Sequence, residues 1–249
     1  MNDFIDPAIA DLLAQHQLNH FSALWDLELD AVDEPNTERG GWSSVAKLTL
    51  GTQSFYLKRQ INHLTRSLQR PFGEPTFARE MRNIQRYQQR GVPALRAAYF
   101  AQRKVAGEQH AILMTYALEG WQDLDYWQQQ WLELSSEQQQ GIVQACAKLA
   151  KTLHQAGQMH GCFYPKHIFL QKQALGFTAQ LIDLEKTRPL LLGQRDRIKD
   201  LEPLFRRSRS VWGRAQIQLF LQNYLDRPED IPHWLERLEA RRKDKAARE

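Results

Sequence analysis

The chain has 249 residues, of which 42% are hydrophobic and 25% charged, and its formal net charge is +4. Such a composition is ordinary for a globular protein that buries a real core as one large domain or two lobes. The small net charge argues against a nucleic-acid partner, and no apolar run approaches the roughly 20 residues that span a bilayer.

The N-terminal segment and the cysteines indicate the compartment. The first residues carry acids where an export signal would carry basic residues. Cys146 lies in a predicted helix and Cys162 in a predicted loop, so no disulfide framework is expected. We therefore expect a cytosolic protein.

The first half of the chain is predicted to be rich in strands. Alternating apolar and polar residues indicate half-buried strands, and apolar residues at three-to-four spacing indicate helices. In chain order we expect a helical lead-in at residues 1–25, a turn at 37–42, and two strands at 45–50 and 54–58. There follow an irregular segment with two prolines and a glycine at 62–75, a helix that stops at a glycine at 76–90, and two more strands at 97–100 and 111–115.

The second half is predicted to be helical, interrupted by one β-hairpin at residues 168–183. No flexible linker separates the halves, so we expect two lobes, 1–116 and 117–249, that share one hinge and one cleft. The predicted fold class is α+β, with an N-terminal antiparallel sheet and one helix, followed by a mostly helical C-terminal lobe.

Two charged residues of the first half are candidates for phosphate binding. Lys58 ends a predicted strand, and Glu80 lies early in the following helix, where its carboxylate could orient the lysine through an ion pair. A lysine held in this way can place its charge against the phosphates of ATP. As ordinary surface residues, the two would be unremarkable.

Asp183 is the strongest candidate for binding a metal ion. It follows Leu181 and Ile182 on a predicted, largely buried strand, where a charge is costly unless it is paired or binds metal. The alternative role is a structural one, in which the carboxylate caps the following turn.

The loop upstream of this hairpin carries a recognisable pattern. Protein-kinase-like chains have L-H-x-x-G-x-x-H-x-D-x-x-x-x-N before such a hairpin. Leu153, His154, Gly157 and His160 fall at the matching positions. We expect both histidines to be structural and to fix the loop through backbone hydrogen bonds.

With these motifs the chain resembles the lipopolysaccharide-core (Kdo/heptose) kinases, and in particular their InaA group. The motifs that carry the resemblance are RGGWS (39–43), YLKRQ (56–60), LTRSL with GEPTFARE (64–80), HGCFYPKHIFL (160–170), IDLEK (182–186) and KDLEPLFRRS (199–208).

The resemblance implies a bilobal protein-kinase-like fold that binds ATP between the lobes together with Mg²⁺ or Mn²⁺. Lys58, Glu80 and Asp183 would take the roles described above, and Asp200 would tie the catalytic loop to the helical core. It also implies a sugar or lipid-linked sugar acceptor, at the cytoplasmic side of the inner membrane of a Gram-negative bacterium.

Two positions depart from the kinase pattern. Cys162 stands where the catalytic aspartate is usual, and His167 stands where the metal-binding asparagine is usual. Magnesium prefers oxygen ligands, so His167 is a poor partner for Asp183 in metal binding, although a histidine at this position is a trait of the resembling family. Because imidazole titrates near neutrality, His167 is also a candidate for an alternative base.

Further candidates for nucleotide binding lie at the first turn and at the hinge. The segment has no G-x-G-x-x-G motif, but the backbone at Gly41, Ser43 and Ser44 could face phosphates; a plain hairpin turn is the alternative. Tyr116 and Leu118 lie at the predicted hinge and are expected to line the nucleotide site.

Two further segments have alternative interpretations. The tryptophan-rich stretch at residues 119–134 is either a packed stripe or an aromatic rim beside a carbohydrate. The charged tail from Leu235 is either a solvated helix end or a weak contact with anionic lipid at the inner membrane surface.

Three functions follow from these observations. The first is an ATP-dependent phosphotransferase of the lipopolysaccharide-kinase type with a sugar hydroxyl as acceptor. The second, based on Cys162, is a pseudokinase that acts as a nucleotide-responsive binding module in envelope stress. The third is a small-molecule kinase of the aminoglycoside or choline type.

Overall fold

The computed structural model describes residues 3–37, 40–67 and 70–246. The chain forms two compact units, one of residues 1–86 and 95–119 and the other of residues 87–94 and 120–249. Each unit is described by itself below.

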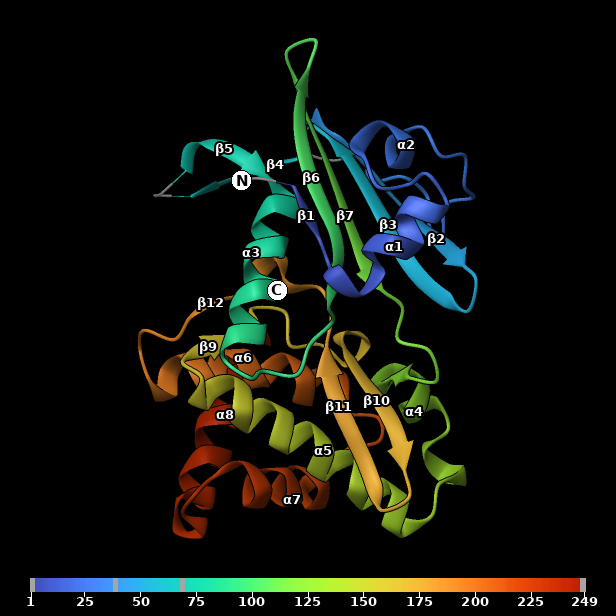
Figure 1. Cartoon of the computed structure of the whole chain (residues 1–249). Helices are drawn as coiled ribbons and strands as arrows, with labels where there is room; N and C mark the ends of the chain where they lie inside the picture. The colour runs from blue at the N-terminus through green and yellow to red at the C-terminus, as the bar shows by residue number, and fades with distance from the viewer. Residues whose placement is uncertain (1–2, 38–39, 68–69, 247–249) are drawn as a thin grey trace. The chain divides into compact units, whose positions relative to one another are not determined.

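The first unit is built on a five-stranded sheet with the strand order β1-β6-β7-β3-β2, in which every pair is antiparallel (Figure 1). Its strands are β1 (Phe4–Ile5), β2 (Trp42–Leu50), β3 (Gln53–Ile61), β6 (Ala97–Val105) and β7 (Glu108–Tyr116). The four predicted strands are therefore confirmed, each longer than the sequence pattern indicated.

One face of this sheet forms the core of the first unit. Buried apolar residues recur at every second position of β2, β3 and β7, as the two-residue period of a strand requires. They are Leu48, Leu50, Phe55, Leu57, Ile112 and Met114. Leu13 and Leu24, from the short helices α1 (Ala10–Gln15) and α2 (Phe21–Trp25), belong to the same cluster.

The predicted helical lead-in is only partly correct. Phe4 and Ile5 form a strand that pairs with Phe100 and Tyr99 of β6, so the sheet gains an edge strand before the helices begin. A two-residue strand shows no periodicity of its own, which is why the sequence pattern could not reveal it. Part of the predicted turn at 37–42 lies outside the described residues.

The prediction of an irregular segment at residues 62–75 is wrong. Here β4 (Leu64–Ser67) and β5 (Arg70–Pro75) pair as a two-stranded antiparallel ribbon with a register shift. Both prolines lie in β5, and Gly73 has a φ of +88°. A separate ribbon with two edges tolerates proline and a local irregularity, which a central strand would not.

Helix α3 (Thr76–Gln89) follows this ribbon as predicted, and Gly91, with a φ of +66°, ends the turn after it. The start of α3 is fixed to β3, because the Phe77 amide donates to Gln60 Oε1 at 2.9 Å. Gln60 lies two residues beyond Lys58 on the same face of β3, opposite the apolar cluster. The helix is thus anchored beside the candidate lysine.

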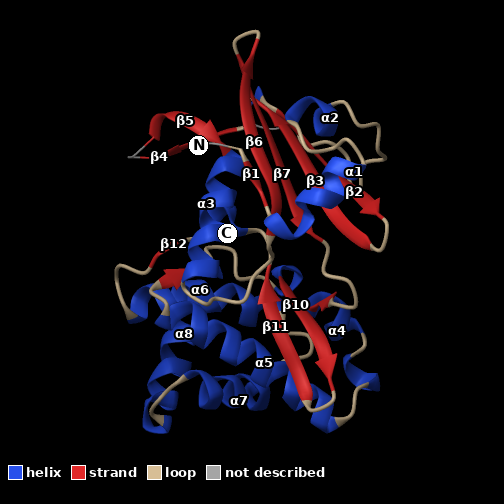
Figure 2. Ribbon diagram, in the orientation of Figure 1, coloured by secondary structure: helices blue, strands red, loops and turns tan. Residues whose placement is uncertain are grey.

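The second unit consists mostly of helices, with short strands at its edges (Figure 2). The helices are α4 (Leu124–Gln129), α5 (Ser136–Gln155), α6 (Gln194–Arg207), α7 (Arg214–Tyr224) and α8 (Ile231–Ala246). The strands are β8 (Gln122–Asp123), β9 (Gln158–Met159), β10 (Ile168–Gln173), β11 (Gly176–Leu181) and β12 (Arg188–Pro189). The predicted hairpin at 168–183 is confirmed as β10 and β11, with β8 pairing on β10.

The longest helix, α5, is defined by its cap and its buried face. Ser135 accepts from the Gln138 amide and Gln138 caps the Ser135 amide in return, which satisfies two donors at the start of the helix. In the tryptophan-rich stretch Leu124 and Trp131 are buried, and Trp131 lies against Trp212 with ring centroids 6.3 Å apart. These two members of the stripe are therefore packed side chains.

The α+β fold class is confirmed, with an antiparallel sheet in the first half and helices in the second. No helix in the described ranges is long and apolar enough to cross a membrane.

The packing of Gly41 gives a prediction about stability. A Cβ added there would lie 2.5 Å from the backbone nitrogen of His63 and 2.7 Å from the carbonyl carbon of Asn62. We expect Gly41→Ala to lower the free energy of unfolding by about 1–3 kcal/mol, because backbone must move to admit the methyl group. Urea unfolding followed by circular dichroism measures this change.

Gly51→Ala is the matched control. Gly51 has a positive φ but nothing within 4 Å of an added Cβ, so it should cost only the roughly 1–2 kcal/mol of left-handed backbone strain. Full stability of the Gly41 variant would contradict the packing explanation.

Candidate functional site

The candidate lysine and glutamate of the first unit form the expected ion pair. Lys58 Nζ lies 2.7 Å from Glu80 Oε1, and the glutamate is buried while the lysine is partly exposed. The ammonium group also lies 6.0 Å from the ring centroid of Phe77. A buried carboxylate thus holds the lysine in one position and leaves part of the ammonium accessible to an anion.

The candidate phosphate-binding backbone of the first turn has other hydrogen-bond partners. The amide of Ser43 donates to the carbonyl oxygen of Asn36 at 2.9 Å. Ser44 lies inside β2 opposite Arg59, and Gly41 packs on the backbone of residues 62–63. The geometry therefore favours the hairpin interpretation of Gly41 and Ser43 over phosphate binding.

The hinge residue Tyr116 is also engaged within its own unit. Its hydroxyl donates to Asp6 Oδ2 at 3.0 Å, and the Arg96 guanidinium lies over its ring at 5.0 Å. Burial and the hydrogen bond to Asp6 raise the pKa of Tyr116 to about 12, so the phenol stays neutral. The Tyr116 and Ala117 amides donate to Arg96 and Ser54 carbonyls. The role of Leu118, the other residue of the predicted hinge pair, stays a prediction.

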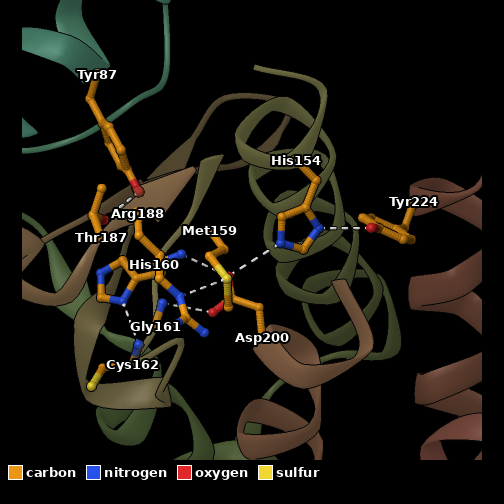
Figure 3. Close-up of polar contacts among 10 residues, drawn as sticks. All are labelled: Tyr87, His154, Met159, His160, Gly161, Cys162, Thr187, Arg188, Asp200 and Tyr224. Atoms are coloured by element: carbon orange, nitrogen blue, oxygen red, sulfur yellow. Dashed lines mark hydrogen bonds and ion pairs between the residues drawn. The ribbon is translucent and has the colours of Figure 1, made fainter. Parts of the chain in front are cut away.

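In the second unit Asp200 of α6 organises the catalytic-type loop (Figure 3). Its Oδ2 accepts from the His160 amide at 2.8 Å, and its Oδ1 accepts from the Gly161 amide at 2.7 Å. His154 Nε2 lies 3.2 Å from Oδ2, while His154 Nδ1 lies 2.7 Å from the Tyr224 hydroxyl. His154 is structural, but its ring contacts the side chains of Asp200 and Tyr224 rather than the predicted backbone groups. Asp200 has the position that the family resemblance implied.

The backbone at Gly161 requires glycine. Its φ is +81°, and an added Cβ would lie 2.7 Å from the carbonyl oxygen of Lys186. The loop therefore passes directly against the segment that follows Asp183.

Asp200 is ionised because its hydrogen bonds outweigh its burial. Burial raises the pKa of this carboxyl, but the hydrogen bond from His154, the nearby histidines and the His160 amide more than offset it, so the pKa lies below 3.8. A buried carboxylate with several donors is the form that this arrangement stabilises.

Asp183 stands in a strained turn directly after β11. Its backbone is left-handed, with φ 58° and ψ 64°, and its side chain is 38% exposed. The neighbouring Ile182 is fixed on both sides, because its amide donates to the His167 carbonyl at 3.1 Å and its own carbonyl lies 2.9 Å from His160 Nε2. Non-glycine residues held in this conformation are concentrated at functional sites.

His167 lies between Asp183 and the loop backbone. Its Nε2 lies 3.2 Å from Asp183 Oδ2, and its Nδ1 lies 2.9 Å from the carbonyl oxygen of Cys162. Burial lowers the pKa of His167 and outweighs the charge of Asp183. A neutral ring carries one N–H, so it can donate to only one of these two oxygens. When Nδ1–H donates to Cys162, the lone pair of Nε2 faces the Asp183 carboxylate, and a cation there would satisfy both groups.

The donor set of this site limits which ion it would hold. Among the residues that the structure describes, no three His, Cys, Asp or Glu side chains are grouped to hold a metal. Mg²⁺ commonly takes one or two carboxylates and completes its shell with water and substrate phosphates. Asp183 fits that pattern, whereas the nitrogen of His167 is a poor magnesium ligand.

Cys162 is buried and has two polar neighbours that the sequence pattern did not single out. Its thiol lies close enough to Tyr164 and Lys186 to interact with both. The interaction with Cys162 is the main cause that raises the pKa of Lys186, whereas burial and then Cys162 raise the pKa of Tyr164. Lys186 belongs to the IDLEK motif, and its basic side chain is the one feature of the sequence that could have indicated a partner for residue 162.

A second feature that sequence reasoning missed is a buried hydrogen bond between Tyr87 and Thr187. The two hydroxyl oxygens are 2.6 Å apart, and they join the end of α3 to the segment after Asp183 (Figure 3). The sequence pattern places Tyr87 in the predicted helix 76–90 but does not show this bond. The Tyr87 phenol fixes the segment between Asp183 and β12.

Asp200→Asn tests the role of this carboxylate in holding the loop. Asparagine offers one acceptor oxygen, so a buried amide loses its partner, and we expect the free energy of unfolding to fall by about 1–3 kcal/mol. The pKa of Asp200 lies below its ordinary value of 3.8. The ionised carboxylate therefore contributes fully to the free energy of unfolding above about pH 4, and this contribution is lost as the pH falls through the lowered pKa. Urea unfolding of both proteins should show a full difference near neutrality that shrinks below about pH 4.

Asp226→Asn is the control for that experiment. Asp226 is an exposed aspartate whose pKa is lowered by Lys151, and its replacement should change stability little. Equal effects of the two substitutions would contradict the special role of Asp200.

Comparison with known proteins identifies the family. Residues 22–224 match the model of the "Lipopolysaccharide kinase (Kdo/WaaP) family". The chain is 33% identical over 172 residues to "Protein InaA" of Escherichia coli (strain K12), covering 68% of this chain and 79% of that protein. A solved structure titled "WaaP in complex with acyl carrier protein" has the same fold, with a TM-score of 0.73, 21% identity, and coverage of 98% of this chain and 99% of that one. The predicted kinase-like fold and family are thereby confirmed: this chain belongs to the lipopolysaccharide kinase (Kdo/WaaP) family.

Proposed function

We propose that this protein transfers the γ-phosphoryl group of ATP to a sugar hydroxyl of lipopolysaccharide or of a related lipid-linked sugar. The observation that carries this proposal is the Lys58–Glu80 ion pair at 2.7 Å. A lysine on a sheet strand, oriented by a buried glutamate of the adjacent helix, is the arrangement that kinase folds use to bind nucleotide phosphates.

The metal would be bound through Asp183. Kinases use ATP with a divalent ion that neutralises charge on the phosphates during transfer. Asp183 offers a partly exposed carboxylate in a fixed turn, which suits such an ion. His167 lies beside that carboxylate, with Nε2 3.2 Å from Asp183 Oδ2, and its neutral ring adds no positive charge that would compete with the metal.

The acceptor class is supported by the family. The matching family model and the InaA relative are those of lipopolysaccharide kinases and their homologues. The structure adds that the catalytic-type loop keeps its shape without the usual aspartate, since Asp200 holds it through backbone amides of His160 and Gly161. A sugar hydroxyl could therefore still be presented to this loop.

The thiol of Cys162 sets the expected rate. General-base assistance contributes typically about 10²- to 10⁴-fold, whereas positioning and charge neutralisation contribute most of the rest in phosphoryl transfer. We therefore expect slow turnover and normal nucleotide binding, with roughly 3–5 kcal/mol of transition-state stabilisation missing relative to an aspartate-bearing kinase.

Transfer of labelled phosphate tests the proposal. Purified protein is incubated with labelled ATP, Mg²⁺ or Mn²⁺, and either core oligosaccharide or soluble amino-alcohols. We expect label on the oligosaccharide, and loss of at least about 100-fold of that rate in both Lys58→Met and Asp183→Ala. Glu185→Ala removes the next carboxylate along the chain, a half-buried one that lies 3.9 Å from Lys186 Nζ. It is the control and should retain the rate. Label on the amino-alcohols would favour the third function, and no label above Asp183→Ala would end the proposal.

A second function, a nucleotide-binding pseudokinase, is favoured by Cys162 itself. The variant Cys162→Asp distinguishes the two functions, because Lys186 offers a cation to an aspartate placed there. If the wild type transfers phosphate, we expect Cys162→Asp to raise the rate by about 10- to 10³-fold. If only the variant transfers phosphate, the wild type is a pseudokinase. Cys146→Asp is unsuitable as a control because that thiol is fully buried in α5, so Cys146→Ala is used.

A further inference from the structure

The loop between β12 and α6 exposes two leucines that no described part of the chain covers. Leu191 is 81% exposed and Leu192 is 57% exposed. They follow β12, which begins five residues after Asp183, and Figure 1 shows this orange loop running out from the second unit before α6 begins. Two adjacent leucines in water carry an unfavourable hydration free energy that a functional contact would relieve.

The leucine loop is held in this exposed form by its backbone. The amides of Leu191 and Leu192 both donate to Asp196 Oδ2 at 2.9 Å, and the Leu190 amide donates to the Gly157 carbonyl at 2.9 Å. Asp196 is itself buried, and these amides outweigh its burial and keep its pKa below the ordinary range. A loop fixed at three amides cannot turn its leucines inward without breaking those bonds.

Basic side chains surround the leucine loop. Arg188, Arg195 and Lys199 are exposed, and none has an ion pair within the described residues. Two of them lie close to the base of the loop, because Arg188 and Lys199 act electrostatically on Asp196. The Asp196 carboxylate at the base accepts from the amides of Leu191 and Leu192. The surface around the leucines is therefore apolar at its tip and positive at its base.

We propose that the leucine loop and its basic base form a docking surface for an anionic lipid bilayer. Apolar side chains that enter the boundary between head groups and acyl chains, flanked by lysine and arginine, are the chemistry of interfacial membrane binding. A protein partner fits less well, since a stable interface buries about 1,600 Å² and two leucines supply a small part of that area.

The charged tail is a weaker candidate for the same contact. The apolar residues of α8, Ile231, Trp234 and Leu238, are buried within the second unit. Leu235, where the tail begins, is half-buried, so the described tail residues offer charge to a membrane but no exposed large apolar side chain. Of the two surfaces, the leucine loop alone combines both components.

This inference does not depend on phosphoryl transfer, because binding to vesicles requires neither ATP nor an acceptor. It would nevertheless place a membrane surface beside the chain segment that follows Asp183, where a lipid-linked acceptor must be reached.

The test measures co-sedimentation of the full chain with vesicles of phosphatidylglycerol and phosphatidylcholine, and with vesicles of phosphatidylcholine alone. We expect binding to the anionic vesicles that weakens with added salt. Leu191→Ser with Leu192→Ser should reduce the partition constant by about 10-fold or more. Arg195→Gln with Lys199→Gln should reduce it by about 10-fold at low salt.

Matched controls come from the same unit. Leu132 and Leu175 are 96% and 98% exposed and lie far from the leucine loop in sequence, so the pair Leu132→Ser with Leu175→Ser should leave the partition constant unchanged. The pair Arg242→Gln with Lys243→Gln tests the tail. Circular dichroism and thermal unfolding of each variant confirm that it is folded.

Several results would overturn the proposal. One is equal binding to neutral and anionic vesicles, and another is no binding to either. A third is a loss of binding in the tail variant but not in the leucine variant. A fourth is no vesicle binding together with concentration-dependent dimerisation that the leucine variant abolishes. A separate measurement uses Leu191→Trp, whose emission should shift to the blue with anionic vesicles and be quenched by brominated lipid. Leu132→Trp should show neither effect, and the same response from both would also overturn it.

Discussion

The second unit depends on one buried carboxylate. Asp200 binds the amides of His160 and Gly161 with its two oxygens, and the loop can take this path only because position 161 is a glycine. The His160 ring then reaches the carbonyl of Ile182, next to the turn that presents Asp183. Since an isolated buried carboxylate would be strongly unfavourable, loop and carboxylate stabilise each other, and the position of Asp183 follows from both.

The shape of the loop is fixed by groups other than the side chain of residue 162. The bonds that fix the loop come from backbone amides and from histidine rings, and none of them uses the side chain of residue 162. The shape of the loop therefore does not depend on which side chain residue 162 carries.

The sequence predicted best those helices and strands whose hydrophobic periodicity alone determines them. The period of two in β3 and the period near 3.6 in α3 predicted both elements. The pairing of Lys58 and Glu80 was a hypothesis drawn from phosphate-binding chemistry, and the structure shows it. The sequence pattern failed at residues 62–75, because a ribbon with two free edges accepts prolines that elsewhere exclude a strand. It also could not show that the Ser43 amide is bonded to Asn36, since a backbone partner across a turn leaves no trace in composition. Contacts such as Tyr87 with Thr187 join residues 100 positions apart and depend on the completed fold.

The surroundings of Cys162 bear on what the substitution means. Lys186 and Tyr164 both interact with Cys162, which is the main cause of the raised pKa of Lys186, whereas burial is the main cause for Tyr164. An adjacent ammonium group stabilises a thiolate as it would a carboxylate. Lys186 therefore offers a cation beside this position, and an aspartate introduced there would not be a buried, unpaired charge.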